Sequence, residues 1–434
     1  MGSMGQSAAG GRVMMNRYAV QATLEAPLAL KQSRQSERSE TLSFVPGTTL
    51  RGALATSYLQ IHGAVDHTFQ TLFLDESRCR FGPLDPAPSV YPLTAVQCKR
   101  HPVDHPKSDH LIYRIIQHLL GGLAPGEIHG RFRVCQQPGC GADMKSCTGF
   151  HSDTEADAKA GHQLDTQVSA HVGIDRTTAT AADGVFYTLK SLSPQRGMQG
   201  PHLVGWMEAD DDAREAITGL LEEEAGVIYL GHHRTRGYGR VKLDIAGPDG
   251  DDASSHDRWQ QWSDRAIEAL QPDLQHSNGS AATLSSENDF IFTLSFPTGA
   301  VLVDRVLRNS LDPASSIDWL PRLPDPSKLF PFEERPATTI GGGQLRCLCA
   351  VTRPELLRGW NSAHGLPKQD EHAVARGAVY AYLFHGDASS REEVINRLEQ
   401  LSQNGMGLRR NEGFGVVKVS DPFHLDALRR EKVS

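Results

Sequence analysis

GHHRTRGYGRVKL, residues 231–243, returns later in the chain as GLRRNEGFGVVKV, residues 407–419. The two stretches align without a gap at an offset of 176 residues (407 − 231), and six positions are identical, including the three glycines. A helix is expected before each copy, and a strand at the end of each. A gapless internal repeat of this kind predicts two copies of one structural unit, and it decides the fold class.

Around the first copy, the sequence predicts a mixed α+β domain over residues 15–245. Alternating apolar residues predict a strand over 17–26. A Pro-Gly turn follows, and then a helix that begins with Thr48 or Thr49 as its N-cap and ends near Gly63. The domain is expected to close with the first copy of the repeat.

Around the second copy, residues 289–434 show the same order of signals. A strand is predicted over 290–296, and a helix over 390–405, where Ser390 and Glu393 have the spacing of a capping box. The repeated stretch follows this helix directly. We therefore expect a second α+β domain built like the first.

Three other stretches complete the predicted organisation. Residues 246–288 are rich in Asp, Ser, Gly and Gln, and predict a polar linker that contains one short helix. Residues 1–14 lack the charged and apolar regions of a signal peptide and predict a flexible leader. Residues 171–192 predict two strands around an Ala-Asp-Gly turn.

Cys347 and Cys349 alternate on a further strand and are expected to share its buried face.

The composition limits the function classes. The chain of 434 residues has 44 Lys and Arg against 52 Asp and Glu, a formal net charge of −8. This balance argues against indiscriminate coating of nucleic acid but allows a local basic groove, because affinity for phosphate depends on the charges beside it. No run of about 18 apolar residues is present, so no membrane span is predicted. Seven unevenly placed cysteines do not form a secreted disulfide framework, and we expect a cytoplasmic protein.

The glycines and arginines of residues 231–243 suit a phosphate ligand. Gly237 and Gly239 can take positive φ and bring backbone N–H groups close to a ligand, where a Cβ would clash. The arginines offer planar forks to phosphate, and Tyr238 offers a ring to a base. The spacing matches neither a Walker loop nor a dinucleotide-binding glycine motif, so a nucleotide cofactor is not favoured. The alternative is a tight turn with solvated arginines.

The second copy of the loop is less basic than the first. Glu412 stands where the first copy has Arg236. A carboxylate beside Arg409 and Arg410 lowers the attraction of the loop for phosphate. We therefore expect the second loop to be mainly structural and to contribute less to any nucleic-acid binding.

The cysteines of the first half have the character of a metal site. Cys135 and Cys140 bracket a Pro-Gly turn, Cys147 follows, and Cys98 could close the set. Four thiolates around a tight turn are what structural Zn²⁺ prefers. The alternative is a set of reduced, partly buried thiols. The histidines that could replace one cysteine are His101, His105 and His151.

Together, FVPGTTLRGALA (44–55), HVGIDRTTATAADGVFYTLKSL (171–192) and the loop at 231–243 resemble the RAMP superfamily of CRISPR-associated proteins. RGWNSAHGLPKQDEHAVARGAVYAYLF (358–384) is similar to the RAMP subunit of type III-D effector complexes. The resemblance implies two ferredoxin-like (RRM-like) domains with antiparallel sheets, the first carrying a zinc-knuckle-like insertion at about 95–150.

The resemblance also implies a function. Two-domain members of this superfamily grip the repeat-derived 5′ handle of the CRISPR RNA without cutting it. They pack against the large signalling subunit and a backbone RAMP subunit, and so meet the target RNA indirectly. The residues expected to contact RNA are Lys31, Arg34, Arg38, Thr48, Thr49, Arg51, His171, Arg176, His232, His233, Arg234, Arg236, Gly237, Tyr238, Gly239, Arg240, Arg409 and Arg410.

An enzyme of the same superfamily is the alternative function. A metal-independent endoribonuclease that matures the CRISPR RNA needs groups that titrate near neutral pH, and His171, His232 and His233 are the candidates. Target-cleaving RAMP subunits usually carry an aspartate before the Pro-Gly turn. Residues 31–45 contain no aspartate, so we expect a binding subunit with no catalytic residue.

Overall fold

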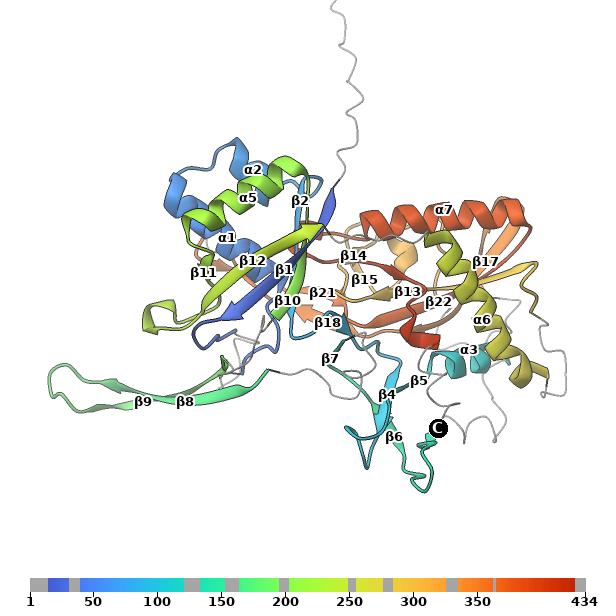
Figure 1. Ribbon diagram of the computed structural model, residues 1–434, viewed down its shortest axis with the longest axis horizontal. Helices are drawn as coiled ribbons and strands as arrows, with labels where there is room; N and C mark the ends of the chain where they lie inside the picture. Colours follow the sequence, from blue (N-terminus) through green and yellow to red (C-terminus); the bar gives the residue numbers. More distant parts are fainter. Residues whose placement is uncertain are drawn as a thin grey trace, which may run out of the picture. The chain divides into compact units, whose positions relative to one another are not determined.

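The structure is a computed structural model, and it describes residues 15–30, 40–120, 133–152, 164–194, 203–248, 255–275, 284–324, 335–361 and 364–425. The chain forms two compact units (Figure 1). Unit 1 comprises Met1–Leu84 and Asp165–Gly250, and unit 2 comprises Asp85–Leu164 and Asp251–Ser434. The cysteine-rich stretch, which the sequence places in the first domain, therefore groups with the C-terminal half. The expected leader at 1–14 lies outside the described residues.

Unit 1 is built on a five-stranded sheet with the order β11-β12-β1-β10-β2. Without its edge strand β11, this is the 4-1-3-2 strand order of a ferredoxin-like fold. The helices α1, α2 and α5 lie together beside the sheet (Figure 1). The elements are β1 (Asn16–Leu24), α1 (Gly47–His62), α2 (His67–Phe73), β2 (Cys79–Asp85), β10 (Leu203–Ala209), α5 (Asp211–Glu223), β11 (Val227–Tyr229) and β12 (Arg240–Pro248).

The predicted helix after the Pro-Gly turn is present as α1, and its end is confirmed. Gly63 takes the left-handed C-cap conformation with φ 74°. Its start differs from the prediction, because Pro46 is the N-cap and both threonines lie in the first turn. The N–H of Thr49 already donates to the Pro46 carbonyl at 2.8 Å, so it is not a donor that a phosphate could use.

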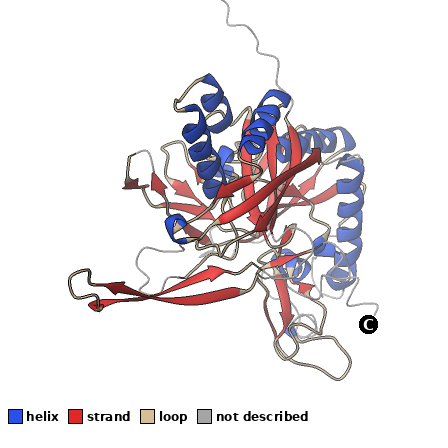
Figure 2. Ribbon diagram, turned by 60° about the vertical axis from the view of Figure 1, so that its left-hand side comes forward, coloured by secondary structure: helices blue, strands red, loops and turns tan. Residues whose placement is uncertain are grey.

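The predicted pair of strands over 171–192 is a long hairpin of β8 (Thr166–Ile174) and β9 (Ala181–Leu192) (Figure 2). The turn is not at the expected Ala-Asp-Gly, which lies inside β9. It falls at 175–180, where the Asp175 carboxylate accepts hydrogen bonds from the N–H groups of Thr177 at 2.7 Å and Thr178 at 3.4 Å. An Asp side chain that bonds the backbone in this way holds a turn without glycine.

Unit 2 repeats the topology of unit 1. Its sheet has the order β16-β17-β22-β13-β23, in which β23-β13-β22-β17 corresponds to β12-β1-β10-β2. The fold is thus mixed α+β with antiparallel sheets, and the ferredoxin-like prediction is confirmed. The elements are α3 (Leu111–Leu119), α6 (Ser255–Gln275), β13 (Asp289–Phe296), β16 (Ala337–Ile340), β17 (Gly343–Val351), β22 (Ala378–His385), α7 (Ala388–Asn404) and β23 (Lys418–Val419).

The sheet of unit 2 is buried on both faces. On β13, Phe290 and Phe292 point into a cluster with Val394 and Leu398 of α7, whereas Ile291 points into a second cluster with α3 and α6. This explains why α6 is a 21-residue helix rather than the short helix expected in a polar linker. The apolar stripe of α6 covers a sheet face that would otherwise be exposed to water.

The helix α7 begins earlier than its predicted capping box. Asp387 is the N-cap, and its carboxylate accepts a hydrogen bond from the N–H of Ser390 at 2.8 Å. The Ser390 hydroxyl instead accepts from the N–H of Gly342 at 2.9 Å, which ties α7 to the turn between β16 and β17. An aspartate is as good an N-cap as a serine, so the helix begins after Asp387, three residues before the predicted cap Ser390.

No helix in the described part of either unit is long and apolar enough to cross a membrane.

Smaller strands complete unit 2. The short pairs are β3 (Ser89–Val90) with β7 (Phe150–His151), β4 (Ala95–Cys98) with β5 (Ser108–Asp109) and β6 (Met144–Ser146), β14 (Leu302–Val303) with β15 (Asn309–Ser310), β18 (Pro354–Leu357) with β21 (Glu371–Val374), and β19 (Trp360–Asn361) with β20 (Leu366–Pro367).

Candidate nucleic-acid interface and metal site

The first glycine-rich stretch forms the connection between β11 and β12, and we call residues 231–239 loop 1. Gly231 and Gly239 have φ values of 73° and 82°. A Cβ on Gly231 would lie 2.3 Å from the Ala29 carbonyl oxygen, and one on Gly239 would lie 2.0 Å from that of Leu230. Both positions therefore require glycine. Between them, Arg234–Arg236 form one turn of 3-10 helix.

The second stretch, residues 407–415 or loop 2, has the same backbone. Gly407 and Gly415 have φ values of 83° and 77°, and their Cβ positions are blocked by the carbonyls of Val301 and Met406. A 3-10 turn again follows a residue in the left-handed region, Arg409 at φ 61°. The repeat seen in the sequence is therefore a repeat of three-dimensional structure.

The arginines of loop 1 lie at the surface. Arg234 and Arg236 are exposed, and within the described ranges no carboxylate lies within 4 Å of either guanidinium. Arg236 hydrogen-bonds to the Tyr187 hydroxyl, and its guanidinium lies 6.0 Å from the Tyr187 ring centre. Arg240 differs, because its Nε is 2.6 Å from a carboxylate oxygen of Glu25. Two arginines of the predicted three thus offer unneutralised charge.

The hairpin β8–β9 contributes a polar face beside loop 1. The rings of His171 and Tyr187, which pair across the hairpin, stack at 5.1 Å and 16°. His171 also accepts or donates a hydrogen bond to Ser169 at 3.2 Å. Sequence reasoning missed Tyr187 and Ser169. Cross-strand pairing with His171 could have found Tyr187 only with the turn placed at 175–180.

Tyr238 does not offer its ring to a base, which corrects the prediction. Its side chain is 8% exposed and packs with Ala29 and Leu189. Its hydroxyl is 2.7 Å from the Ser169 hydroxyl and 3.5 Å from His171 Nε2. Tyr238 therefore anchors loop 1 to the hairpin. The partly exposed aromatic side chain next to the arginines is Tyr187.

One of the two arginines of loop 2, Arg409, is neutralised within the chain. Arg409 lies between two carboxylates, with Nη1 2.5 Å from Glu371 and Nη2 2.5 Å from Glu412. Its guanidinium also lies 5.1 Å from the ring centre of Phe414. Arg410 donates to the Asn404 carbonyl at 3.1 Å. These contacts explain why loop 2 presents much less positive charge than loop 1.

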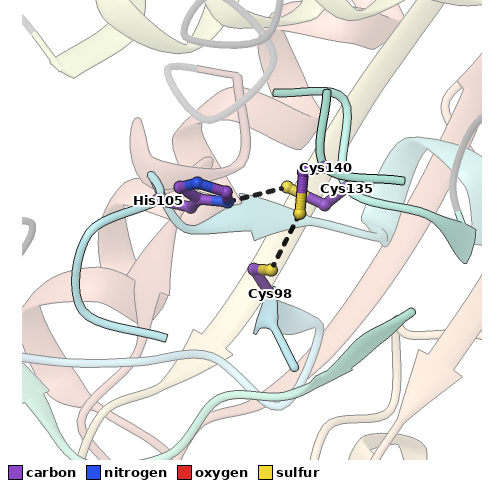
Figure 3. A group of neighbouring side chains, drawn as sticks. All are labelled: Cys98, His105, Cys135 and Cys140. Atoms are coloured by element: carbon purple, nitrogen blue, oxygen red, sulfur yellow. Dashed lines mark hydrogen bonds between the residues drawn. The ribbon is translucent and has the colours of Figure 1, made fainter. Parts of the chain in front are cut away.

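A group of four side chains in unit 2 has the arrangement of a metal site (Figure 3). The sulfur atoms of Cys98 and Cys140 are 3.7 Å apart, and Nδ1 of His105 is 3.2 Å from the sulfur of Cys135. All four donor atoms lie within 4.8 Å of one another. Tetrahedral Zn²⁺ with bonds of about 2.3 Å to sulfur would separate two thiolates by about 3.8 Å. The donor set could hold a metal ion.

Backbone donors prepare the sulfur atoms for this role. The N–H of His101 points at the Cys98 sulfur at 3.3 Å. Burial alone would raise the pKa of Cys98, but hydrogen bonds from the N–H groups of His101 and Arg100 and from the neighbouring thiols bring it below its ordinary value. Burial raises the pKa of Cys135 to about 11 in the absence of a metal. Of these two cysteines, Cys98 is the one more disposed to be a thiolate.

A sequence model of the RAMP superfamily matches residues 26–242, half of the 434-residue chain. The chain belongs to the RAMP superfamily of CRISPR-associated proteins. The match includes the cysteine-rich stretch and loop 1, and it ends inside β12. A comparison with curated proteins found no match.

Solved structures similar to this RAMP chain come from cryo-EM work on type III-B Cmr-beta. One, bound to cognate target RNA and AMPPnP, is 11% identical with a TM-score of 0.38 and covers 88% of each chain. Another, bound to cognate target RNA, is 11% identical with a TM-score of 0.37 and covers 91% of this chain and 99% of its own. At this level of likeness they carry no argument about function.

The structure of this RAMP chain changes one member of the metal-binding set that the sequence predicts. Cys147 is not in the group, and His105 takes its place. Cys147 donates its backbone N–H to the Ala95 carbonyl at 2.9 Å, whereas Cys98, which is in the group, ends the same strand. Three residues along a strand span about 10 Å, so both sulfurs cannot reach one ion. His101 and His151 are not in the group either: His151 stacks on Tyr91 at 4.6 Å, and the His101 ring is tilted against that of His105 at 4.7 Å.

The remaining predicted RNA-binding residues differ in their exposure and in their contacts. Arg51 donates Nε–H to the Phe73 carbonyl at 2.7 Å, which fastens α1 to α2, and its expected contact with RNA stays a prediction. Thr48 is half-buried in the first turn of α1. Arg176 is exposed in the turn between β8 and β9, and His232 is exposed in loop 1 while His233 is half-buried. The predicted contacts outside the described residues are Lys31, Arg34 and Arg38.

One further hydrogen-bonded chain has the connectivity of a catalytic triad. Ser295 lies 3.2 Å from His424 Nε2, and His424 Nδ1 lies 2.5 Å from the Asp109 carboxylate. The exposed fractions are 5%, 0% and 1% respectively. A nucleophile needs access to substrate, so this chain is a structural network that fastens the C-terminal segment of unit 2 to β13 and β5.

Proposed function

We propose that this RAMP protein is the RNA-binding subunit of a type III CRISPR effector ribonucleoprotein, of the III-D-like kind, and that it grips the 5′ handle of the CRISPR RNA. The observation that carries the proposal is loop 1, in which two exposed arginines, with no carboxylate partner among the described residues, stand on a backbone that requires glycine at Gly231 and Gly239. The large signalling subunit and backbone RAMP subunits are its proposed neighbours in antiviral defence. They follow from the family resemblance of the sequence.

The chemistry of loop 1 supports a phosphate backbone as its ligand. Arg234 and Arg236 supply charge-assisted hydrogen bonds, which are stronger than neutral ones. Tyr187 beside Arg236 supplies a partly exposed ring on which a base can stack, worth about 1–3 kcal/mol per base. The hydrogen bond of Tyr238 to Ser169 fixes loop 1 against the hairpin, so these groups are held in place before RNA arrives.

The test is Arg234→Ala plus Arg236→Ala, assayed on labelled handle RNA over a range of salt concentrations. Each lost phosphate contact lowers the salt slope of binding by about one unit, so we expect weaker binding and a slope shallower by about two. The matched control is Arg409→Ala plus Arg410→Ala, which removes the same charge from loop 2. Equal losses from both loops would contradict the assignment of binding to loop 1.

We propose that the subunit binds RNA without cutting it. The histidines of the alternative enzyme sit where they could equally contact RNA, and His171 is engaged with Ser169 and Tyr187. Pure protein incubated with labelled repeat RNA and chelator should leave the RNA intact. Cleavage that is lost in His232→Ala or His233→Ala, with folding unchanged, would instead establish a metal-independent endoribonuclease.

We also propose that the group of Cys98, His105, Cys135 and Cys140 holds a structural Zn²⁺ ion. Three sulfurs and one imidazole nitrogen fill a closed tetrahedral site, and their spacing suits that ion better than the harder cations that prefer oxygen. When bound, zinc would tie the end of β4 to the turn at 135–140. It would keep the thiolates of both segments charged inside the protein.

Freshly purified protein is expected to contain about one equivalent of zinc, measured by elemental analysis. Cys140→Ser should lose the metal, whereas Cys147→Ser should keep it, because Cys147 lies outside the group. Cobalt substitution provides a second measurement, since a site with three sulfurs gives strong thiolate-to-cobalt absorption. Absence of metal from unchelated protein, or equal metal loss in both variants, would rule out this site.

A further inference from the structure

Loop 2 has the same backbone as loop 1, but carboxylates of the chain itself, those of Glu371 and Glu412, pair with its Arg409. Gly407 and Gly415 have the positive φ values and blocked Cβ positions of their counterparts in loop 1. The hydrogen bonds agree as well. The N–H of Leu408 donates to the Val301 carbonyl at 2.9 Å, as that of His232 in loop 1 donates to Ala29 at 3.0 Å.

Two carboxylates pair with Arg409 of loop 2. Glu371 reaches Arg409 from β21, and Glu412 comes from the loop itself. Glu412 is also 3.0 Å from the ammonium of Lys368, and only 7% of it is exposed. Burial raises its pKa, but Arg409 and Lys368 outweigh this effect and hold the pKa below its ordinary value. Glu412 is therefore charged at neutral pH.

The corresponding place in loop 1 holds no such anion from the residues that the structure describes. Arg236 stands at the position of Glu412, and His233 at the position of Arg409. Neither Arg234 nor Arg236 has a carboxylate within 4 Å in the part of the chain that the structure describes. The same scaffold thus carries open cations in one unit and internally paired cations in the other.

We propose that loop 2 is a second binding site for RNA backbone phosphate, which the carboxylates of Glu371 and Glu412 occupy in the free protein. This inference rests on the proposed function of loop 1, because phosphate is the anion that loop 1 is proposed to hold. Guanidinium groups bind carboxylate and phosphate with the same bidentate geometry, so one can replace the other. Withdrawal of Glu371 with β21 would open Arg409 and Lys368 to RNA.

The test removes the internal anions without changing side-chain size. Glu371→Gln plus Glu412→Gln should bind a short labelled oligouridylate several-fold more tightly at low salt. The salt slope should steepen by about one to two, one unit for each freed cation that meets a phosphate. Arg409→Ala in this background should reverse the gain. The matched control, Glu222→Gln plus Glu223→Gln on the exposed side of α5, changes the net charge equally.

The possible outcomes separate the alternatives. A gain no larger than that of the control would overturn the second site and leave Glu371 and Glu412 as a structural lock. A gain for inorganic phosphate, measured by calorimetry, without a gain for RNA would also overturn it. If the double variant fails to fold by circular dichroism, Glu371→Gln alone gives the test, because its side chain is already 34% exposed. Loss of binding in the loop 1 variant judges the proposed function separately.

Discussion

Gly237 and Gly239 both have positive φ in loop 1, but only one of them is closely surrounded. Space is open around the Cβ position of Gly237, whereas that of Gly239 lies 2.0 Å from a carbonyl oxygen. Gly237→Ala should therefore cost only the strain of a left-handed residue, about 1–2 kcal/mol. Gly239→Ala should cost more, because the backbone of β11 must also move. Thermal melting of the two variants measures the difference, and equal losses would contradict it.

The residues of loop 1 show how far sequence reasoning extends. Its glycines and arginines could be predicted, because glycine at positive φ and arginine at a phosphate site follow from local chemistry. The role of Tyr238 could not, because its burial depends on Ser169 and Leu189 in a distant hairpin. The pairing of Arg240 with Glu25 escaped for the same reason. Long-range contacts decide which side chains stay exposed.

His424 is expected to make the stability of unit 2 depend on pH. Burial lowers its pKa, but the Asp109 and Asp421 carboxylates outweigh burial and raise the pKa above 6.5, while Lys418 opposes them weakly. A histidine whose pKa is raised on folding stabilises the fold fully below its unfolded pKa of about 6.5. This contribution is lost as pH rises through the folded value.

The measurement is the melting temperature of the wild type and of His424→Gln between about pH 5.5 and about pH 9. The gap between the two proteins should be widest at the acidic end and narrow above the raised pKa. Asp109→Asn should remove most of the pH dependence as well. A gap that widens toward alkaline pH would show that the buried histidine is neutral.

At the scale of elements, the strongly patterned strands and helices were predictable and the exceptions have identifiable causes. The stretch 246–288 looked like a linker because its ends are polar, yet Trp262 inside it is 4% exposed in the core of unit 2. Composition averaged over a long stretch hides a short apolar stripe. The expected shared face of Cys347 and Cys349 is wrong, because a bulge between them sends the two side chains into different core clusters. Regular alternation cannot reveal a bulge.

At the scale of the whole molecule, the metal site is expected to stabilise unit 2 rather than the N-terminal half. Its four ligands lie in Asp85–Leu164, which belongs to unit 2. Chelation should lower the melting temperature of unit 2 and expose the segment between Cys98 and Cys140 to protease. The melting temperature of unit 1 should not change. The fluorescence of Trp206 in β10 reports on unit 1, and that of Trp262 in α6 reports on unit 2. Parallel loss of both units would contradict this assignment.

The division of the chain between the units has a consequence for its synthesis on the ribosome. Asp85–Leu164 belongs to unit 2, although the chain before it, up to Leu84, and the chain after it, from Asp165, belong to unit 1. Unit 1 cannot close its sheet until β12 has left the exit tunnel, and by then the apolar side of α3 has already emerged without α6 to cover it. A nascent chain stopped near residue 250 would carry this uncovered helix. We therefore expect the growing polypeptide to need protection of this apolar surface, for example by a chaperone, until the second half arrives.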